Sequence, residues 1–303
     1  MTVSSRHILE QSSSLGALGR VLLTTLEQQV LGKMPKTKPK TPGPLLEAVY
    51  PARSKELVQD YIAHVGGDPA AYKGTLPAHM FPQWGFGLGG RALEGVPYRM
   101  SRVLNGGCNY ELRAPIPAGE PLQVTARLES IDDDGRRAVM QQRVITSTPS
   151  VKEALIADLF AIVPLGGGKK EGNGAPKKDA KKEVPSVPRN AREIAFLELH
   201  AKAGLDFAKL TGDFNPIHWI PAAARASGFQ NVILHGFGTM ARTVEALNKN
   251  VFGGNPHAIR KWSCRFTRPL VLPAKVSVYV LAQEVFVGAA PGGAAYLVGN
   301  FES

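Results

Sequence analysis

The feature that most constrains the fold of this chain is a Gly-, Lys- and Pro-rich segment near its middle. Residues 166–189 read GGGKKEGNGAPKKDAKKEVPSVPR and contain few large apolar side chains. Such a composition cannot bury enough apolar surface to offset the entropy lost on ordering, so we expect an exposed linker. The linker leaves two parts, residues 45–165 and 190–303, each the length of an ordinary domain.

A second basic, Pro-rich run, KMPKTKPKTPGP, ends a separate N-terminal segment, residues 1–44. Apolar residues in this segment recur at helical spacing and predict a helix. They are Leu15, Leu18, Leu22, Leu26 and Val30. The sequence leaves open whether this helix packs on the body of the protein or rests on a membrane surface or a partner.

The net charge of +11 is concentrated in these two low-complexity segments. Residues 1–44 and 166–189 each carry a net charge of +4. Charge runs in tails and linkers are usually solvated, and neither half has the basic surface of a nucleic-acid-binding domain. We therefore expect no nucleic-acid partner. A modest positive field suits a substrate carried on phosphates, such as coenzyme A or an acyl carrier protein.

Composition also bounds the compartment. No stretch approaches the roughly 18 consecutive apolar residues of a transmembrane helix. The N-terminus has no uninterrupted apolar run after a basic start, so we expect no cleaved secretory signal. Two cysteines, Cys108 and Cys264, do not make a disulfide framework, and the final residues, Asn-Phe-Glu-Ser, are not a peroxisomal address. We expect a cytoplasmic protein with no transmembrane segment.

The order of predicted elements indicates an α+β fold. In the first half we expect a helix at 54–64, two strands around the Asp-Asp-Asp-Gly turn at 132–135, and a strand at 155–163. In the second half we expect helices at 191–202 and after His235, then strands at 259–268, 274–287 and 294–302. A helix followed by consecutive strands predicts an antiparallel sheet with the helix on one face.

The two halves also echo each other. Cys108-Asn-Tyr110 and Cys264-Arg-Phe266 are each followed by a proline, an aliphatic residue and an alternating strand. Two copies of one fold are the simplest account.

The strongest chemical signal lies in the run FAKLTGDFNPIHWIPAAARASGF, residues 207–229. Asp213 and Asn215 can form Asx turns and Pro216 fixes its own φ, so the loop should be rigid. It can present Asp213 and His218 toward one water, which one group deprotonates while the other orients it. The alternative from these residues alone is that Asp213 caps a turn and His218 is structural.

A second signal is His235-Gly236, where an apolar-periodic helix begins. Unsatisfied N–H groups at a helix start suit a developing oxyanion, and a glycine there lets a thioester carbonyl approach closely. An ordinary helix start is the alternative.

Together these residues resemble a known family. The run Leu210-Thr-Gly-Asp213-x-Asn215-Pro216-Ile-His218, followed by His235-Gly236, is similar to MaoC-like dehydratases and (R)-specific enoyl-CoA hydratases, also called hydratase 2. The resemblance continues through Arg265-Phe266-x-x-Pro269-Leu270 and touches VLNGGCNYELRAPIPAGEPL in the first half. It covers roughly residues 45–165 and 190–303.

The resemblance implies a double hot dog: two antiparallel sheets, each wrapped around a central helix, in one chain. It implies that Asp213 and His218 are catalytic, that the Gly236 N–H supports a thioester enolate, and that Asn215 and His235 bind substrate. The reaction would be reversible addition of water to a trans-2-enoyl thioester, giving the (3R)-hydroxyacyl thioester. No metal or redox cofactor is implied. Coenzyme A or acyl-carrier phosphopantetheine enters as part of the substrate.

The first half lacks the Asp-x-Asn-Pro-x-His motif. We expect it to be non-catalytic and to shape a pocket for the acyl tail. Phe81, Trp84 and Phe86 could line that pocket or belong to the core. A Gly85–Gly90 match to G-x-G-x-x-G lacks the preceding strand that a dinucleotide site requires.

Two other functions remain open at this point, a non-catalytic acyl-thioester-binding subunit of a heteromeric hydratase and a hot-dog thioesterase. Association into a homodimer is possible.

Overall fold

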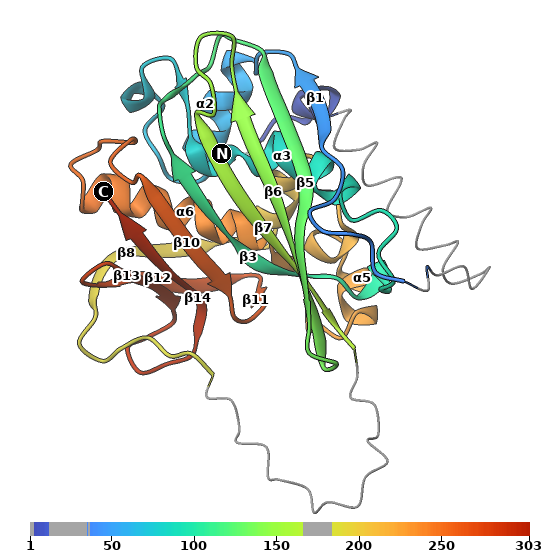
Figure 1. Ribbon diagram of the computed structural model, residues 1–303. Helices are drawn as coiled ribbons and strands as arrows, with labels where there is room; N and C mark the ends of the chain where they lie inside the picture. The colour runs from blue at the N-terminus through green and yellow to red at the C-terminus, as the bar shows by residue number, and fades with distance from the viewer. Residues whose placement is uncertain (1–2, 12–34, 36, 166–183) are drawn as a thin grey trace, which may run out of the picture.

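The structure is a computed structural model that describes residues 3–11, 35, 37–165 and 184–303 (Figure 1). The helix expected between Leu15 and Val30, and most of the expected linker, lie outside these residues. The first half has these main elements: β1 (Leu46–Tyr50), α2 (Lys55–His64), α3 (Pro82–Arg91), β3 (Leu104–Leu112), β5 (Leu122–Asp133), β6 (Arg137–Ser147) and β7 (Leu155–Pro164). The second half has β8 (Arg192–Leu199), α4 (Ala203–Thr211), α5 (Pro221–Ala226), α6 (Gly236–Asn250), β10 (Lys261–Phe266), β12 (Ala274–Leu281), β13 (Glu284–Gly288) and β14 (Ala295–Glu302).

Short elements connect the larger ones. They are the strands β2 (Thr75–Leu76), β4 (Ile116–Pro117), β9 (Ile233–Leu234) and β11 (Leu270–Val271), and the 3₁₀ helices η1 (Ser5–Gln11), η2 (Pro69–Tyr72), η3 (Ala78–Met80), η4 (Met100–Arg102) and η5 (Pro216–His218). β2 pairs with β4 in the first half as β9 pairs with β11 in the second.

The main strands form one antiparallel sheet in the order β1-β5-β6-β7-β3-β10-β14-β13-β12-β8. Read outward from the centre, both halves have the same order of equivalent strands. They meet where β3 pairs with β10, and there Cys108 lies directly opposite Cys264, with 3.9 Å between the two sulfur atoms. The two halves are thus copies of one fold, related by an approximate twofold axis beside this cysteine pair, as the sequence repeat predicts. The two expected sheets join edge to edge into one.

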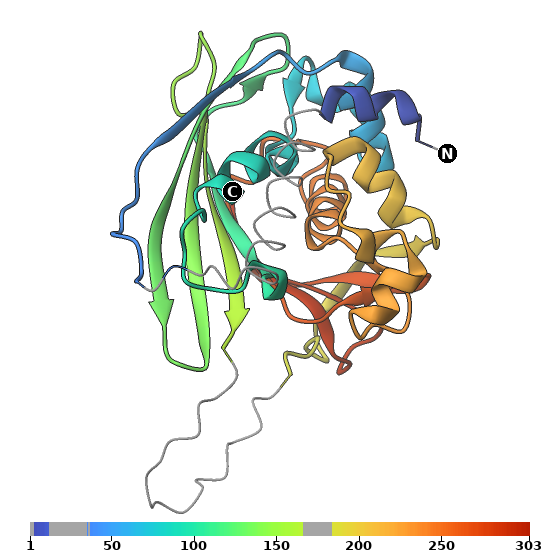
Figure 2. The same cartoon turned by 90° about the vertical axis from the view of Figure 1, so that its right-hand side faces the viewer.

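The sheet curves around two central helices, α3 and α6 (Figure 2). Twelve of the 15 residues of α6 are buried, so this helix is enclosed on nearly all sides. In α3, a methyl group added at Gly85 or Gly89 would come within 3.0 Å of Val144 or Leu159 of the sheet. These glycines therefore allow α3 to pack closely on the strands. The G-x-G-x-x-G match lies inside a helix and is not a nucleotide-binding turn.

Several sequence expectations are confirmed. The Ser54 hydroxyl accepts a hydrogen bond from the Leu57 N–H at 3.2 Å and caps α2. β5 and β6 form the expected hairpin. Of the three aromatic residues whose role was open, Phe81 and Trp84 belong to the core and are 0% and 1% exposed, whereas Phe86 is 43% exposed.

The helix expected at 191–202 is wrong. Residues 192–199 form β8, which pairs with β12, and the helix α4 begins only at Ala203. Ala, Glu and Leu favour a helix locally, but pairing with the open edge of β12 satisfies the backbone and overrides that preference. The single strand expected at 274–287 is also wrong, because a turn at Ala282, with φ of 52°, divides it into β12 and β13.

The linker ends earlier than expected. Ser186 forms a β-bridge with Ala294, and Val187 is fully buried against Tyr279 and Phe286. Residues 184–189 therefore belong to the second half. No helix among the described residues is both long enough and apolar enough to cross a membrane.

Candidate active site

The loop that carries Asp213 begins at the C-terminus of α4. Gly212 adopts a left-handed conformation with φ of 80°, and its N–H donates to the Ala208 carbonyl at 2.7 Å. This is a helix ending that glycine makes without strain. Beyond it, the Asn215 side chain accepts a hydrogen bond from the Ile217 N–H and caps η5, whose first residue is Pro216. The expected turn between Gly212 and Pro216 is present, and its rigidity stays a prediction.

His218 is buried at the end of η5, with 8% of its surface exposed. Its Nδ1 lies 2.8 Å from the Ile233 carbonyl oxygen. Since a carbonyl only accepts, Nδ1 carries the proton and Nε2 of the neutral ring is left as an acceptor. Burial lowers the pKa of His218, and the Asp213 carboxylate and the bond to Ile233 oppose that shift without cancelling it. The ring is therefore a neutral imidazole at neutral pH.

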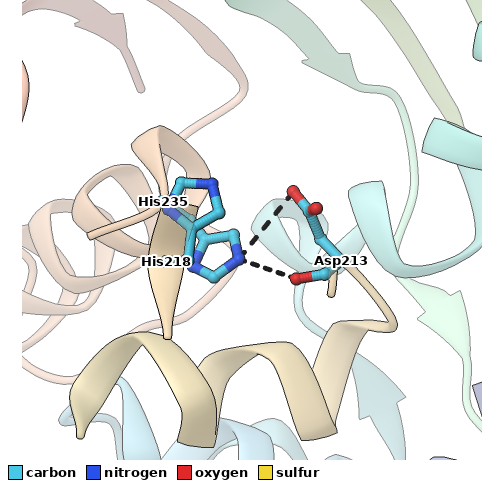
Figure 3. A group of neighbouring side chains, drawn as sticks. All are labelled: Asp213, His218 and His235. Carbon is cyan, nitrogen blue, oxygen red and sulfur yellow. Dashed lines mark hydrogen bonds and ion pairs between the residues drawn. The ribbon is translucent and has the colours of Figure 1, made fainter. Parts of the chain in front are cut away.

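The His235 ring stacks on the His218 ring, with the ring centroids 3.6 Å apart (Figure 3). Its Nε2 donates to the Asp213 main-chain carbonyl at 2.9 Å and lies 3.9 Å from the Asp213 carboxylate. Burial and the neighbouring His218 lower the pKa of His235 to about 3. A neutral His235 thus supports the His218 ring on one side and holds the Asp213 loop on the other.

Asp213, His218 and His235 are the described residues that come close enough together to hold a metal ion, with one possible ligand atom of each within 4.8 Å of the others. One hydrogen bond argues against that use of His235 Nε2. His235 Nε2 carries a proton toward the Asp213 carbonyl, and a protonated nitrogen cannot bind a metal.

Gly236 is the first residue of α6, and its N–H has no hydrogen-bond acceptor within the described part of the chain. The N-terminal N–H groups of a helix lack intrahelical partners and lie at the positive end of its dipole. A methyl group at Gly236 would come within 2.5 Å of the Phe266 ring. Glycine at this position therefore lets the ring pack against the helix start.

Sequence reasoning missed the residues that support the site. A methyl group at Gly204 would lie 2.1 Å from the His218 carbonyl oxygen, so this glycine lets α4 pack against η5. The Phe207 ring lies 5.1 Å from the His235 ring. The sequence signal for Gly204 was a glycine among helix-forming residues, which often marks a place where another part of the backbone packs closely. Phe266 was part of the repeated triplet Cys264-Arg-Phe266, but the sequence did not indicate a role for it.

The matching place in the first half is built differently. η2, the counterpart of η5, ends in Tyr72 rather than in a histidine. The Tyr72 hydroxyl donates to Glu245 of α6 at 2.6 Å, and His79 Nε2 lies 3.0 Å from the same carboxylate oxygen. All three side chains are buried. A sealed polar network thus occupies the place that a second site would take.

Two surface cavities lie away from Asp213, His218 and Gly236. One, of about 350 Å³, lies over the junction of β3 and β10 beside Asn109 and Ser263. The other, of about 470 Å³, lies between residues 71–75 and residues 253–257. Neither tests the expected acyl-tail pocket, which stays a prediction.

The curved sheet around two helices and the Asp–His loop before a helix start define a double hot-dog protein with one such site. Residues 182–291, which lie almost entirely in the second half, match the model of the MaoC like domain family.

Proteins of known activity and solved structures resemble this chain. Peroxisomal enoyl-CoA hydratase 2 of Arabidopsis thaliana is 27% identical over 184 residues, which are 58% of this chain and 59% of that protein. The 3-hydroxyacyl-thioester dehydratase X of Mycobacterium tuberculosis is 38% identical over 108 residues, 36% of this chain and 35% of that protein. The chain thus matches less than two thirds of either relative.

The crystal structure of HtdX from M. tuberculosis superposes with a TM-score of 0.66 at 20% identity, covering 85% of this chain and 99% of that one. A further M. tuberculosis protein, described as having a double hot-dog fold, gives a TM-score of 0.55 at 13% identity, covering 86% of this chain and 96% of that one. These likenesses show the fold.

Proposed function

We propose that this protein is a hydro-lyase that adds water reversibly to trans-2-enoyl thioesters and forms (3R)-hydroxyacyl thioesters, in fatty-acid metabolism. One observation carries the proposal. The Asp213 carboxylate and the neutral His218, whose Nε2 is an acceptor, come together beside His235, the residue that precedes the Gly236 N–H. The activities named for the relatives, enoyl-CoA hydratase and 3-hydroxyacyl-thioester dehydratase, agree with this chemistry.

In the hydration direction, a water molecule is held between Asp213 and His218. His218 Nε2 accepts a proton from the water as its oxygen bonds to Cβ, while the Asp213 carboxylate accepts the other O–H and orients the attack. The electron pair of the Cα–Cβ double bond moves toward the thioester carbonyl, and the Gly236 N–H stabilises the resulting enolate oxygen. The proton taken by His218 then goes to Cα. Dehydration is the reverse.

Two further residues stay in the proposal as substrate-binding groups. The Asn215 oxygen is already used to cap η5, so its amide N–H groups are the part that can reach a substrate. His235 stacks on His218 and holds the Asp213 main-chain carbonyl, so its contribution to binding acts through the position of the loop.

The proposal also covers the role of the first half, the carrier of the substrate, and the location and partners of the protein. The first half, residues 45–165, is non-catalytic and holds the acyl tail, and its sealed Tyr72–Glu245 contact supports the absence of a second site. The substrate carries coenzyme A or acyl-carrier phosphopantetheine, and no metal or redox cofactor takes part. We place the protein in the cytoplasm, without a nucleic-acid partner, and a homodimer is compatible with the fold.

The test compares wild type with Asp213→Asn and His218→Ala on trans-2-enoyl-CoA substrates of increasing chain length. Loss of a positioned acid–base group should lower turnover by about 10²–10⁴-fold in each variant while the far-UV circular dichroism stays unchanged. Equal turnover in either variant would contradict the assigned site.

The same experiment separates the two alternatives. Binding of acyl-CoA without turnover would support a non-catalytic subunit, and release of a free thiol would support a thioesterase.

A further inference from the structure

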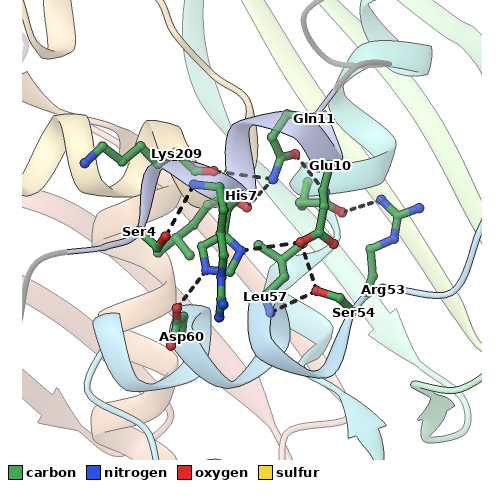
Figure 4. Close-up of polar contacts among 12 residues, drawn as sticks. Ser4, His7, Glu10, Gln11, Arg53, Ser54, Leu57, Asp60 and Lys209 are labelled. Atoms are coloured by element: carbon green, nitrogen blue, oxygen red, sulfur yellow. Dashed lines mark hydrogen bonds and ion pairs between the residues drawn. The ribbon is translucent and has the colours of Figure 1, made fainter.

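The N-terminal residues 3–11 lie across the joint between the two halves. η1 packs against α4, the helix that leads to Asp213. On the other side, His7 is fully buried, and its Nε2 lies 2.7 Å from the Asp60 carboxylate of α2 (Figure 4). Glu10 of η1 accepts a hydrogen bond from Ser54, the residue that caps α2. The segment is therefore anchored on both halves.

Gln11, the last residue of η1, is the point where these contacts reach the site. Its side chain is fully buried. Its Nε2 donates to the main-chain carbonyl of Leu210 at 3.1 Å and lies 3.5 Å from that of Lys209. Its Oε1 accepts from Gln83 of α3 at 2.8 Å, and Gln83 in turn accepts from Arg53 at 3.3 Å.

The two carbonyls that Gln11 meets belong to the last turn of α4. Carbonyls in the last turn of a helix have no intrahelical partner, and a buried one left without a donor costs free energy. Lys209 in the same turn donates through Nζ to the Val3 carbonyl at 3.0 Å. Three residues after Leu210 comes Asp213. The N-terminal segment therefore fixes the helix end from which the catalytic loop departs.

Building on the proposed function, we propose that Gln11 is a positioning residue for Asp213. It contacts no reacting atom. By capping α4 it holds the Gly212–Asp213 turn where the carboxylate meets the water that His218 deprotonates. A displacement of about 1 Å in such a group can lower turnover by roughly 10²-fold, so a cap this close to the loop should be visible in kcat.

The test uses Gln11→Leu, with Gln83→Leu as its matched control in the full-length chain. Both side chains are buried, and both substitutions break the Gln11–Gln83 bond, but Gln11→Leu alone also removes the donor to Leu210. We expect Gln11→Leu to lower kcat about 10-fold beyond Gln83→Leu, with KM within about twofold of wild type. Hydrogen exchange of amides 211–214 should be faster in Gln11→Leu than in Gln83→Leu.

A second variant, Gln11→Glu, keeps an acceptor for Gln83 and loses the donor to Leu210, and it should reproduce the kcat defect if Gln11→Leu does not fold. Equal kcat and equal exchange in the Gln11 and Gln83 variants would overturn the proposal, because Gln11 would then serve stability alone. The exchange measurement needs no substrate. If the wild-type protein showed no activity, the proposed function would be contradicted. Faster exchange of amides 211–214 in Gln11→Leu than in Gln83→Leu would still support the role of Gln11 as a cap of α4.

Discussion

At the scale of single residues, hydrogen bonds to main-chain carbonyls decide the protonation of the site. Ile233 fixes the proton of His218 on Nδ1, and Asp213 fixes that of His235 on Nε2. Burial keeps both rings neutral. The sequence predicted that Asp213 and His218 would share one place, because the Asx turns and the proline are local. It could not predict the tautomers, because Ile233 is 15 residues away from His218 and belongs to another element.

The lowered pKa of His218 predicts the pH dependence of hydration. The neutral ring is the base, so kcat/KM should stay level as the pH falls from 8 through 6.5, the ordinary value for histidine, and decline only below it. The Asp213 carboxylate raises the pKa of His218, so Asp213→Asn should shift the NMR titration of the His218 ring to still lower pH. An acidic limb centred at or above 6.5 would show that another group controls the rate.

At the scale of elements, packing sets where helices begin and how closely they approach. The sequence located the start of α6 from its apolar period, and the structure adds that Phe266 lies against that start. Residues 192–199 show the limit of local reasoning. Their composition favours a helix, and only the edge of β12, some 80 residues later in the chain, makes them a strand.

Gly236→Ala tests the packing at the start of α6. The added methyl group meets the Phe266 ring at 2.5 Å, so the ring or the helix start must move. We expect a loss of about 1–3 kcal/mol in the free energy of unfolding and a fall in kcat. Gly90→Ala in α3 is the control, because a methyl group there has no atom within 4 Å and should leave stability equal or higher. If Gly236→Ala matched Gly90→Ala, the close contact with Phe266 would carry no cost.

At the scale of the whole molecule, the approximate twofold symmetry is broken at the candidate site. The second half carries Asp213 and His218, and the first half has the buried Tyr72–Glu245 contact at the matching place. The repeat of Cys108 and Cys264 in the sequence predicted two copies of one fold, and their direct pairing in the sheet confirms it. The sequence could not show what replaced the second site. Tyr72 and His79 come from the first half and Glu245 from α6, and their contacts depend on how the halves pack.

Tyr72→Phe tests whether this buried network ties the halves together. The hydroxyl bonds a buried carboxylate at 2.6 Å, and removing a partner of a charged group costs about 1.5–3 kcal/mol. Urea unfolding should show a loss of that size. Tyr296→Phe is the control, because the described residues offer its hydroxyl no hydrogen-bond partner, and its change should stay within about 0.5 kcal/mol. Equal effects would mean that the network adds nothing to stability.

The central claim is that this site adds water to an enoyl thioester. The most direct test is to incubate the wild-type protein with a trans-2-enoyl-CoA in ²H₂O, follow the loss of enoyl absorbance and analyse the product. The account predicts (3R)-3-hydroxyacyl-CoA carrying one carbon-bound deuterium at Cα, with no free thiol. The (3S) product, free coenzyme A, or persistence of enoyl absorbance across all chain lengths would contradict it.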